Sequence, residues 1–240
     1  ANLLDSELIT LSVGDVSENE LEELSIYGAS KIFSANKLEK VDSQALSSII
    51  EKLVEENDVN TIIFSNSYTS KMAAPRLAIK LTAGVLSNVV SLARSVTPFQ
   101  VKKKVFSGKA FEIIETRTAK RILMIVPNAF AINKSTSNYE VQKIEISESG
   151  NIVVEGQEKI SGKINLSEAE IIVSAGRGLK DSKNWGMIES LAKILGAATA
   201  CSKPVADIGW RPHSEHVGQT GKVVAPNLYI AIGISGAIQH

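Results

Sequence analysis

The stretch that decides the fold is EIIVSAGRGLKDSKNWGMIESLAKIL, which runs from Glu170 to Leu195. It opens with the apolar run EIIVSAG, and a run of this kind is typical of a buried strand in a parallel sheet. The turn at Arg177-Gly178 follows, and a helix is expected from about Asp181 to Leu195. One stripe of that helix is apolar and consists of Trp185, Ile188, Ala192 and Leu195. A strand, a glycine-rich turn and a helix in this order predict one half of a doubly wound α/β domain.

Two further strands of this second half are also followed by loops. The strand AATAC (197–201) precedes Ser202-Lys203-Pro204 and the irregular segment DIGWRPHSEHVGQTGK (207–222). The strand LYIAIG (228–233) precedes the turn SGAIQH (235–240). In doubly wound folds ligands lie across the carboxyl ends of the strands. The order therefore predicts a ligand site built from these loops.

The first half, residues 1–140, alternates strand-like and helix-like segments. Strands are expected at ELITLSV (7–13), KIFS (31–34) and VNTIIFS (59–65). Helices are expected at SENELEELSIYGA (17–29), where Ser17 and Glu20 form a capping box, at DSQALSSIIEKLVEEN (42–57), and at TSKMAAPRLAIKLTAGV (69–85). This alternation predicts a parallel sheet with helices on both faces. Residues 92–126 are strand-rich, and Gly108 indicates a hairpin.

We expect two α/β domains. The polar segment 146–170 separates them, and the boundary is placed near residues 155–165. The domains are accordingly expected at 1–158 and 164–240.

Charge, cysteine content and the length of the apolar runs limit the classes of function that this chain can have. The 26 basic and 26 acidic residues cancel, which argues against nucleic-acid binding driven by net charge, and the run Lys102–Lys104 reads as a solvated strand edge. Cys201 is the single cysteine, and it reads as a buried, inert thiol. No apolar run has the length of a membrane span, and the first residues are no signal peptide. These features fit a reducing compartment and no membrane insertion.

Several short motifs do not carry the chemistry that they suggest. GRGLKD has Asp181 where a dinucleotide fingerprint has its third glycine, although its turn can still meet an anion. GQTGKVV has Val223 after the lysine of a would-be P-loop, and GISGA ends in Ala237 where a nucleophile elbow has glycine. The three histidines, His213, His216 and His240, lack metal-ligand spacing, so no metal site is expected.

The segments GRGLKDSKNWGMIESLAKILGAATACSKPVADIGW and VGQTGKVVAPNLYIAIGISGAIQH together resemble the FAD-binding domain of the alpha subunit of electron transfer flavoprotein. The resemblance is specific over residues 164–240. It extends more loosely over the first half, where SGKAFEIIET and PNAF have counterparts in the family. It implies an N-terminal nucleotide-hydrolase-like (HUP-like) domain with a parallel sheet, followed by a doubly wound FAD-binding domain.

The resemblance also implies the residues that contact FAD. Arg177 would lie along the flavin, and Ser202 and Lys203 would approach it from the next loop. The isoalloxazine loop would consist of Val217, Gly218, Gln219 and Thr220, with the Thr220 hydroxyl at flavin N5. The cofactor would be wrapped on its pyrophosphate and ribityl side by Ser235, Gly236, Ala237, Ile238, Gln239 and His240, with His240 near the flavin O2 edge. Reduced flavin is negative at N1 and O2, so a donor or cation there raises its potential.

The sequence departs from the family in two respects. The family usually has Arg where this chain has Lys203, and Lys keeps the charge but loses the planar stacking fork. The family also continues beyond GISGAIQH with a strand and an acidic residue that serve the adenosine half of FAD. We therefore expect a FAD domain that is incomplete at its C-terminus, a cofactor that is weakly held or absent, and a shortened N-terminus.

The resemblance implies an electron carrier rather than a substrate-converting enzyme. Its partners would be the beta subunit, flavin dehydrogenases such as acyl-CoA dehydrogenases, and a membrane quinone reductase, in the bacterial cytoplasm or the mitochondrial matrix. The alternative is a non-redox nucleotide-binding or scaffold module, which the first half alone would fit. An NAD-dependent enzyme is disfavoured by the missing third glycine.

Overall fold

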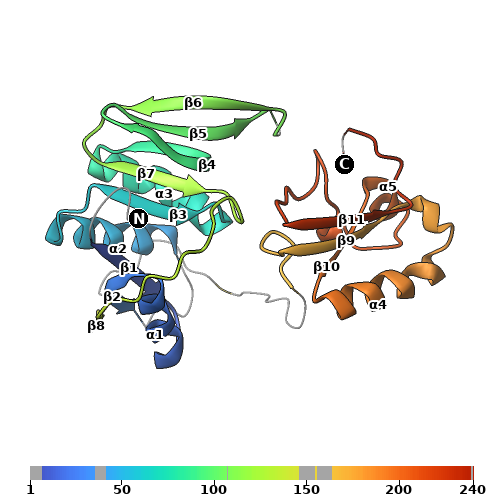
Figure 1. Ribbon diagram of the computed structural model, residues 1–240, viewed down its shortest axis with the longest axis horizontal. Helices are drawn as coiled ribbons and strands as arrows, with labels where there is room; N and C mark the ends of the chain where they lie inside the picture. Colours follow the sequence, from blue (N-terminus) through green and yellow to red (C-terminus); the bar gives the residue numbers. More distant parts are fainter. Residues whose placement is uncertain (1–6, 36–41, 107, 146–154, 156–163, 239) are drawn as a thin grey trace. The chain divides into compact units, whose positions relative to one another are not determined.

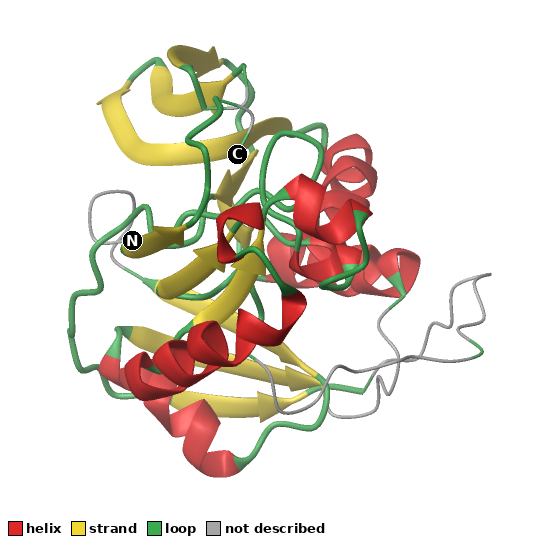
Figure 2. Ribbon diagram, turned by 90° about the vertical axis from the view of Figure 1, so that its right-hand side faces the viewer, coloured by secondary structure: helices red, strands yellow, loops and turns green. Residues whose placement is uncertain are grey.

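The computed structural model describes residues 7–35, 42–106, 108–145, 155, 164–238 and 240 (Figure 1). The chain divides into two compact units. The first comprises Ala1–Val126 with Phe130–Glu158, and the second comprises Pro127–Ala129 with Lys159–His240. The expected boundary at 155–165 lies largely outside the described residues, so its position stays a prediction. Both units mix helices and strands, so the predicted α/β class is confirmed (Figure 2).

Where the structure describes the first unit, its strands form two sheets. One is fully parallel in the order β1-β2-β8, with bounds Leu8–Val13, Ala29–Ala35 and Glu140–Lys143. The other is mixed, in the order β3-β7-β4-β5-β6, with bounds Thr61–Ser65, Arg121–Ile125, Gly84–Val96, Phe99–Val105 and Ala110–Thr116. In the mixed sheet β3, β7 and β4 are parallel, and β5 pairs antiparallel with β4 and β6. The hairpin predicted at Gly108 is confirmed as the β5–β6 turn, where Gly108 has φ +86°.

The described residues of this unit form three helices, and the ends of these helices follow local rules. Their bounds are Glu18–Ile26 (α1), Ser43–Glu56 (α2) and Tyr68–Leu81 (α3). Ser17 and Glu20 form the predicted capping box on α1, and Asp42 caps α2 through the amides of Gln44 and Ala45. The helix expected over 69–85 was too long, because Thr82 adopts the left-handed conformation that ends α3, and Gly84 already begins β4.

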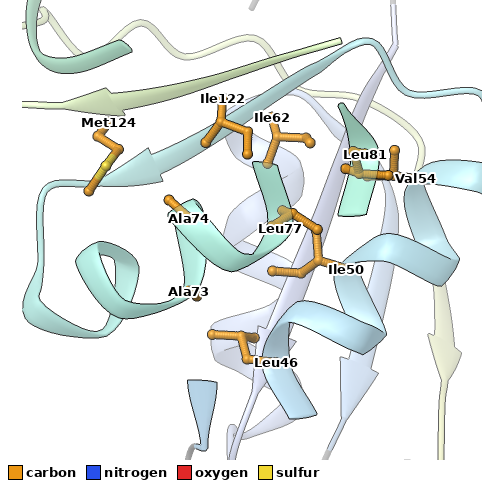
Figure 3. Packing of buried hydrophobic residues seen from close by; sticks show 10 residues of the cluster. All are labelled: Leu46, Ile50, Val54, Ile62, Ala73, Ala74, Leu77, Leu81, Ile122 and Met124. Atoms are coloured by element: carbon orange, nitrogen blue, oxygen red, sulfur yellow. The ribbon is translucent and has the colours of Figure 1, made fainter. Parts of the chain in front are cut away.

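The main core of the first unit lies between α2, α3 and the strands β3 and β7 (Figure 3). Its side chains are Leu46, Ile50 and Val54 from α2, Ala73, Ala74, Leu77 and Leu81 from α3, Ile62 from β3, and Ile122 and Met124 from β7. All residues of strand β1 are only partly buried. The reason is its place at an edge of the three-stranded sheet.

The second unit is built on three parallel strands in the order β10-β9-β11. Their bounds are Ala198–Cys201, Ile171–Ala175 and Leu228–Ile232, as the sequence predicted for strands in these segments. The helices are Trp185–Leu195 (α4) and Lys203–Asp207 (α5), with 3-10 turns at Arg177–Leu179 (η1), Ser182–Asn184 (η2) and His213–Glu215 (η3). The helix expected from Asp181 therefore begins four residues later. The Asp181 carboxylate accepts from Lys183 N at 2.9 Å and caps the 3-10 turn instead.

The two faces of this sheet are covered differently. On one face α4 and α5 pack with Val173, Ala175 and Cys201. Trp185 is buried there and Trp210 packs at its margin, so both tryptophans are packing residues. The other face is covered by loop residues, among them Leu166, Ala169 and Val217, packed against Ile172, Ala198 and Ala200.

Candidate functional site

All the loops expected to contact a ligand begin at the carboxyl edge of the β10-β9-β11 sheet. Because the three strands are parallel, their carboxyl ends at Ala175, Cys201 and Ile232 lie at one edge. Backbone hydrogen bonds join the loops directly beyond that edge. Ser202 N donates to Ala175 O at 3.1 Å, Gly176 N donates to Ile232 O at 2.9 Å, and Val217 N donates to Cys201 O at 3.1 Å. The sequence-predicted loops are thus brought together.

Three glycines hold the loops after β9 and β11 in backbone contact. Gly178 N donates to Gly233 O at 2.9 Å. A Cβ at Gly176 would lie 2.3 Å from Gly233 O, and one at Gly178 would lie 2.5 Å from Gly233 Cα. Gly233 itself has φ +62°, a left-handed conformation that favours glycine. Any side chain at Gly176 or Gly178 would force the two loops apart.

The segment after Gly233 presents small residues and free backbone donors. Ser235, Gly236, Ala237 and Ile238 are exposed, and among the described hydrogen bonds none is donated by their backbone N–H groups. Gly236 has φ +72°. Exposed, unpaired N–H groups on a small-residue loop suit an anion such as a phosphate. Gln239 lies outside the described residues.

The loop after β10 carries a buried hydroxyl and a paired cation. Ser202 is buried and is the N-cap residue that precedes α5. Lys203 is exposed, and its Nζ lies 2.8 Å from Asp207 Oδ2. The hydrogen bond from Lys203 lowers the pKa of Asp207 and so favours the charged carboxylate. Arg177, from the loop after β9, is exposed and carries the second cation of this edge.

The loop that contains VGQT is closed on His216. Lys222 N donates to His216 O at 2.8 Å, and Gly221 N donates to Gly218 O at 3.0 Å. A Cβ at Gly221 would lie 2.8 Å from His216 Cγ, so the loop backbone lies directly against the imidazole. Val217 is buried, whereas Gln219 and Thr220 are exposed at the tip. The loop therefore presents the two polar side chains on a rigid base.

An ion-pair network anchors the base of that loop to α4. The Arg211 guanidinium donates from Nε and Nη2 to both carboxylate oxygens of Glu215, each at 2.7 Å, and from Nη1 to Glu189 Oε1 at 2.9 Å. Glu215 is buried, and the guanidinium lies 5.3 Å from the centre of the Trp185 ring. These hydrogen bonds raise the pKa of Arg211 further. A bidentate Arg–carboxylate pair of this kind fixes orientation.

The last described residue of the segment, His240, folds back onto β11. The imidazole Nε2 of His240 lies 2.7 Å from Tyr229 Oη. The backbone N–H of His240 donates to Ala237 O at 3.0 Å. Burial lowers the pKa of His240, and His216 lowers it further. His240 Nδ1 is buried without a hydrogen-bond partner among the described residues.

The edge shows no metal-binding group and no activated thiol among the residues that the structure describes. No cluster of three His, Cys, Asp or Glu side chains there could hold a metal ion. Burial, aided by Glu215, raises the pKa of Cys201 to about 11, which fits the inert thiol that the sequence predicted. Within the described residues, no helix is both long and apolar enough to span a bilayer.

Comparison with known families shows the protein family of this chain. Residues 165–240 match the electron transfer flavoprotein FAD-binding domain, and residues 1–149 match the electron transfer flavoprotein domain. The chain belongs to the electron transfer flavoprotein alpha subunit family. The resemblance and the fold class expected from the sequence are thus confirmed. Electron transfer is the function class of this family.

Relatives of the electron transfer flavoprotein family match along nearly the whole chain. The electron transfer flavoprotein subunit alpha of Bacillus subtilis is 33% identical over 242 residues, which cover 98% of this chain and 74% of the relative. The corresponding subunit of Syntrophomonas wolfei is 30% identical over 246 residues, covering 100% and 78%. Protein FixB of Clostridium saccharobutylicum is 30% identical over 250 residues, covering 100% and 75%.

The sequence analysis did not single out four residues of this flavoprotein unit, although each had a signal in the sequence or in the strand order. Gly233 was considered only as part of the rejected nucleophile elbow. It directly follows β11, and its carbonyl oxygen would lie 2.3 Å from a Cβ added at Gly176. Tyr229 on β11 is the register partner of Ile172 on β9, and its ring packs on the sheet face covered by Val217. Arg211 and Glu215 stand four positions apart, a spacing that could have indicated an ion pair.

Proposed function

We propose that this chain binds FAD at the carboxyl edge of β10-β9-β11 and serves as the electron-carrying alpha subunit of an electron transfer flavoprotein. The observation that carries the proposal is the three-glycine contact between Gly176, Gly178 and Gly233. It leaves bare backbone where two loops meet, beside exposed N–H groups. Such a cradle suits the close approach of a pyrophosphate. The match of residues 165–240 to a FAD-binding domain supports FAD as the nucleotide.

The residues present fit the cofactor in charge as well as in shape. Arg177 and Lys203 supply cations, and the Ser235–Ile238 segment supplies N–H donors toward the anionic half of FAD. Gln219 and Thr220 would extend from the VGQT loop toward the ring, and His240 would supply a half-buried imidazole beside it. Arg177, Ser202, Lys203, Val217–Thr220 and Ser235–His240 are thus proposed to contact FAD. When bound, FAD supplies the electron-accepting ring, while the protein sets its position and potential.

We further propose the partners that this role requires. A beta subunit would complete the flavoprotein, flavin dehydrogenases such as acyl-CoA dehydrogenases would deliver electrons, and a membrane quinone reductase would receive them. The compartment would be the bacterial cytoplasm or the mitochondrial matrix. The described chain needs no substrate-converting group for this role, since electrons enter and leave through the flavin.

The test is the absorbance spectrum of the purified chain after incubation with FAD and gel filtration, alone and with its beta subunit. Flavin bands that co-elute with protein in at least one of these samples are expected. FMN under the same conditions should co-elute less, because it lacks the second phosphate and the adenosine. Absence of co-eluting flavin in both samples would contradict the proposal and favour a non-redox nucleotide-binding or scaffold module.

A further inference from the structure

His216 lies at the base of the VGQT loop, residues 217–222, and connects that loop to the sheet. It directly follows the 3-10 turn η3 and is only 7% exposed. Its backbone forms an isolated parallel bridge with Cys201 at the end of β10, and its carbonyl accepts from Lys222 N at 2.8 Å. His216 is therefore held against the sheet on one side and against the returning arm of the loop on the other.

The imidazole of His216 is the platform on which that returning arm rests. A Cβ at Gly221 would lie 2.8 Å from both Cγ and Nδ1 of the ring, which is closer than real Cβ atoms approach. The bare backbone of Gly221 thus lies directly against the ring. Gly221 N donates to Gly218 O at 3.0 Å, and Gly218 N donates to Lys222 O at 3.3 Å, so the loop closes on itself above the platform.

The charges around His216 do not favour a positive charge on its ring. Burial lowers the pKa of His216 below its ordinary value, and the nearby Lys203 lowers it further. Asp207 acts in the opposite direction, but its carboxylate is already paired with Lys203 at 2.8 Å. The other titratable groups around His216 are His213 on η3, Cys201 on β10, His240 after β11, and Glu215, whose carboxylate is held by Arg211.

A proton on this ring therefore opposes the closed loop. A buried imidazolium without a carboxylate of its own costs desolvation free energy, and the ring reaches water when the Gly221 arm moves off it. The ordinary pKa of the ring is 6.5, so an open loop takes up a proton below that pH, whereas the closed loop takes one up only at lower pH. The closed loop is thus favoured at neutral pH and loses stability as the pH falls below 6.5.

We propose that His216 is a positioning residue whose neutral imidazole holds the VGQT loop closed, and that a proton on this ring opens the loop and weakens its hold on the flavin. The closure of the loop is a property of the protein alone. The effect on the flavin rests on the proposed function, in which Gln219 and Thr220 contact the flavin from this loop. Because one proton is involved, the effect is at most about tenfold for each pH unit below the ordinary pKa.

The first experiment follows the loop without cofactor. Hydrogen exchange of the Lys222 and Gly218 amides, expressed as protection factors, removes the intrinsic pH dependence of exchange. Between about pH 7.5 and about pH 5.5 the protection should fall several-fold and by at most about tenfold, because opening takes up one proton. His216→Gln keeps a polar side chain but does not titrate, so its protection should respond less to pH. His213→Gln, a matched change at the exposed neighbouring histidine, should keep the full response.

The platform contact is tested separately by Gly221→Ala. Its Cβ would lie 2.5 Å from His216 O as well as 2.8 Å from the ring, so the protection of Lys222 should fall at both pH values. Unchanged protection in this variant would overturn the contact. An equal pH response in His216→Gln and the unmodified chain, or no response in the unmodified chain, would overturn the proposal even where the variant has lower protection throughout.

The second experiment measures FAD affinity by flavin fluorescence at the same two pH values. The affinity of the unmodified chain should be lower at the acid pH, and the ratio between the two pH values should be smaller in His216→Gln. Equal ratios would overturn the link between this ring and the flavin. Failure of the unmodified chain to bind FAD at either pH would instead contradict the proposed function, and the exchange experiment would still decide whether His216 controls the loop.

Discussion

Gly178 and Gly233 meet backbone to backbone: the N–H of Gly178 donates to the carbonyl of Gly233 at 2.9 Å, and a Cβ on Gly178 would lie 2.5 Å from Gly233 Cα. The contact joins loops from two neighbouring strands at the edge where the cofactor is proposed to bind. Because both partners are backbone atoms, neither can rotate away. The shape of this edge therefore depends on the absence of a side chain.

The first prediction follows from that contact. Gly178→Ala should weaken FAD binding by about tenfold or more, equivalent to about 1.4 kcal/mol, because the displaced loops no longer fit the phosphates. It should also destabilise the second unit by about 1–3 kcal/mol, as overpacking does. FAD titration followed by flavin fluorescence measures the affinity. The matched control is Gly186→Ala in α4, whose added Cβ would meet no atom within 4 Å, and equal affinities for the two variants would refute the cradle.

The second prediction concerns the Arg211–Glu215 pair. Arg211→Met should lower the free energy of unfolding of the second unit by about 2–4 kcal/mol, because it removes the bidentate guanidinium from the buried Glu215 carboxylate. Urea unfolding measured by circular dichroism checks this. Lys52→Met removes the exposed Lys52–Glu56 pair, whose N–O distance is 3.9 Å, and should cost less than about 0.5 kcal/mol. A similar loss in both variants would mean that burial does not distinguish the pairs.

The third prediction addresses the cation on α5. Lys203 is paired with Asp207 at 2.8 Å, which partly neutralises the charge that it offers to a flavin. Asp207→Asn should therefore raise the flavin midpoint potential, because an unpaired cation favours the anionic reduced ring. Lys203→Arg should also shift the midpoint, because the guanidinium can stack where the ammonium cannot. A redox titration of the three proteins compares them, and three identical midpoints would place Lys203 away from the flavin.

The fourth prediction concerns pH. Burial raises the pKa of Cys201 to about 11 from a reference value of 9.0, so between these pH values the folded chain holds a proton that the unfolded chain has lost. Stability therefore falls as pH rises from about 9 toward 11, and below 9 this thiol contributes no pH dependence. Urea midpoints at several alkaline pH values measure the fall, which should be smaller in Cys201→Ala. Thiol labelling of the folded chain at pH 8 should be at least about 100-fold slower than that of the unfolded chain.

The sequence predicted strands, helices and the meeting of the loops at one sheet edge wherever apolar periodicity and strand order carried the signal. The apolar stripe of α2 and the apolar run at 171–175 are two examples, because the positions that are buried in the core are apolar in the sequence. It failed where a single backbone conformation decides the outcome. The left-handed Thr82 ends α3, and the Asp181 cap diverts the chain into 3-10 turns before Trp185. Periodicity carries no trace of either.

The candidate site divides in the same way. The loops that bear Arg177, Ser202 and Val217 could be grouped in advance, because parallel strands end at one edge. The contacts of Gly233 and the pairing of Tyr229 with His240 could not, because they depend on how two loops fold back across the sheet. The residue pattern thus predicts which loops meet, whereas the contacts between their atoms depend on the conformation that the loops adopt.

The strand register also bears on the order in which the chain folds. Strand β2 pairs with β8, where Lys31 is opposite Glu140, so the three-stranded sheet must join segments roughly a hundred residues apart. In the second unit β9 pairs with β10 only a short helix away, as Ile172 opposite Ala198 shows. During synthesis β2 would thus wait for its partner until Glu140–Lys143 has left the ribosome. We expect β2 to remain an open sheet edge through that interval, which makes it the segment of the nascent chain most in need of a chaperone.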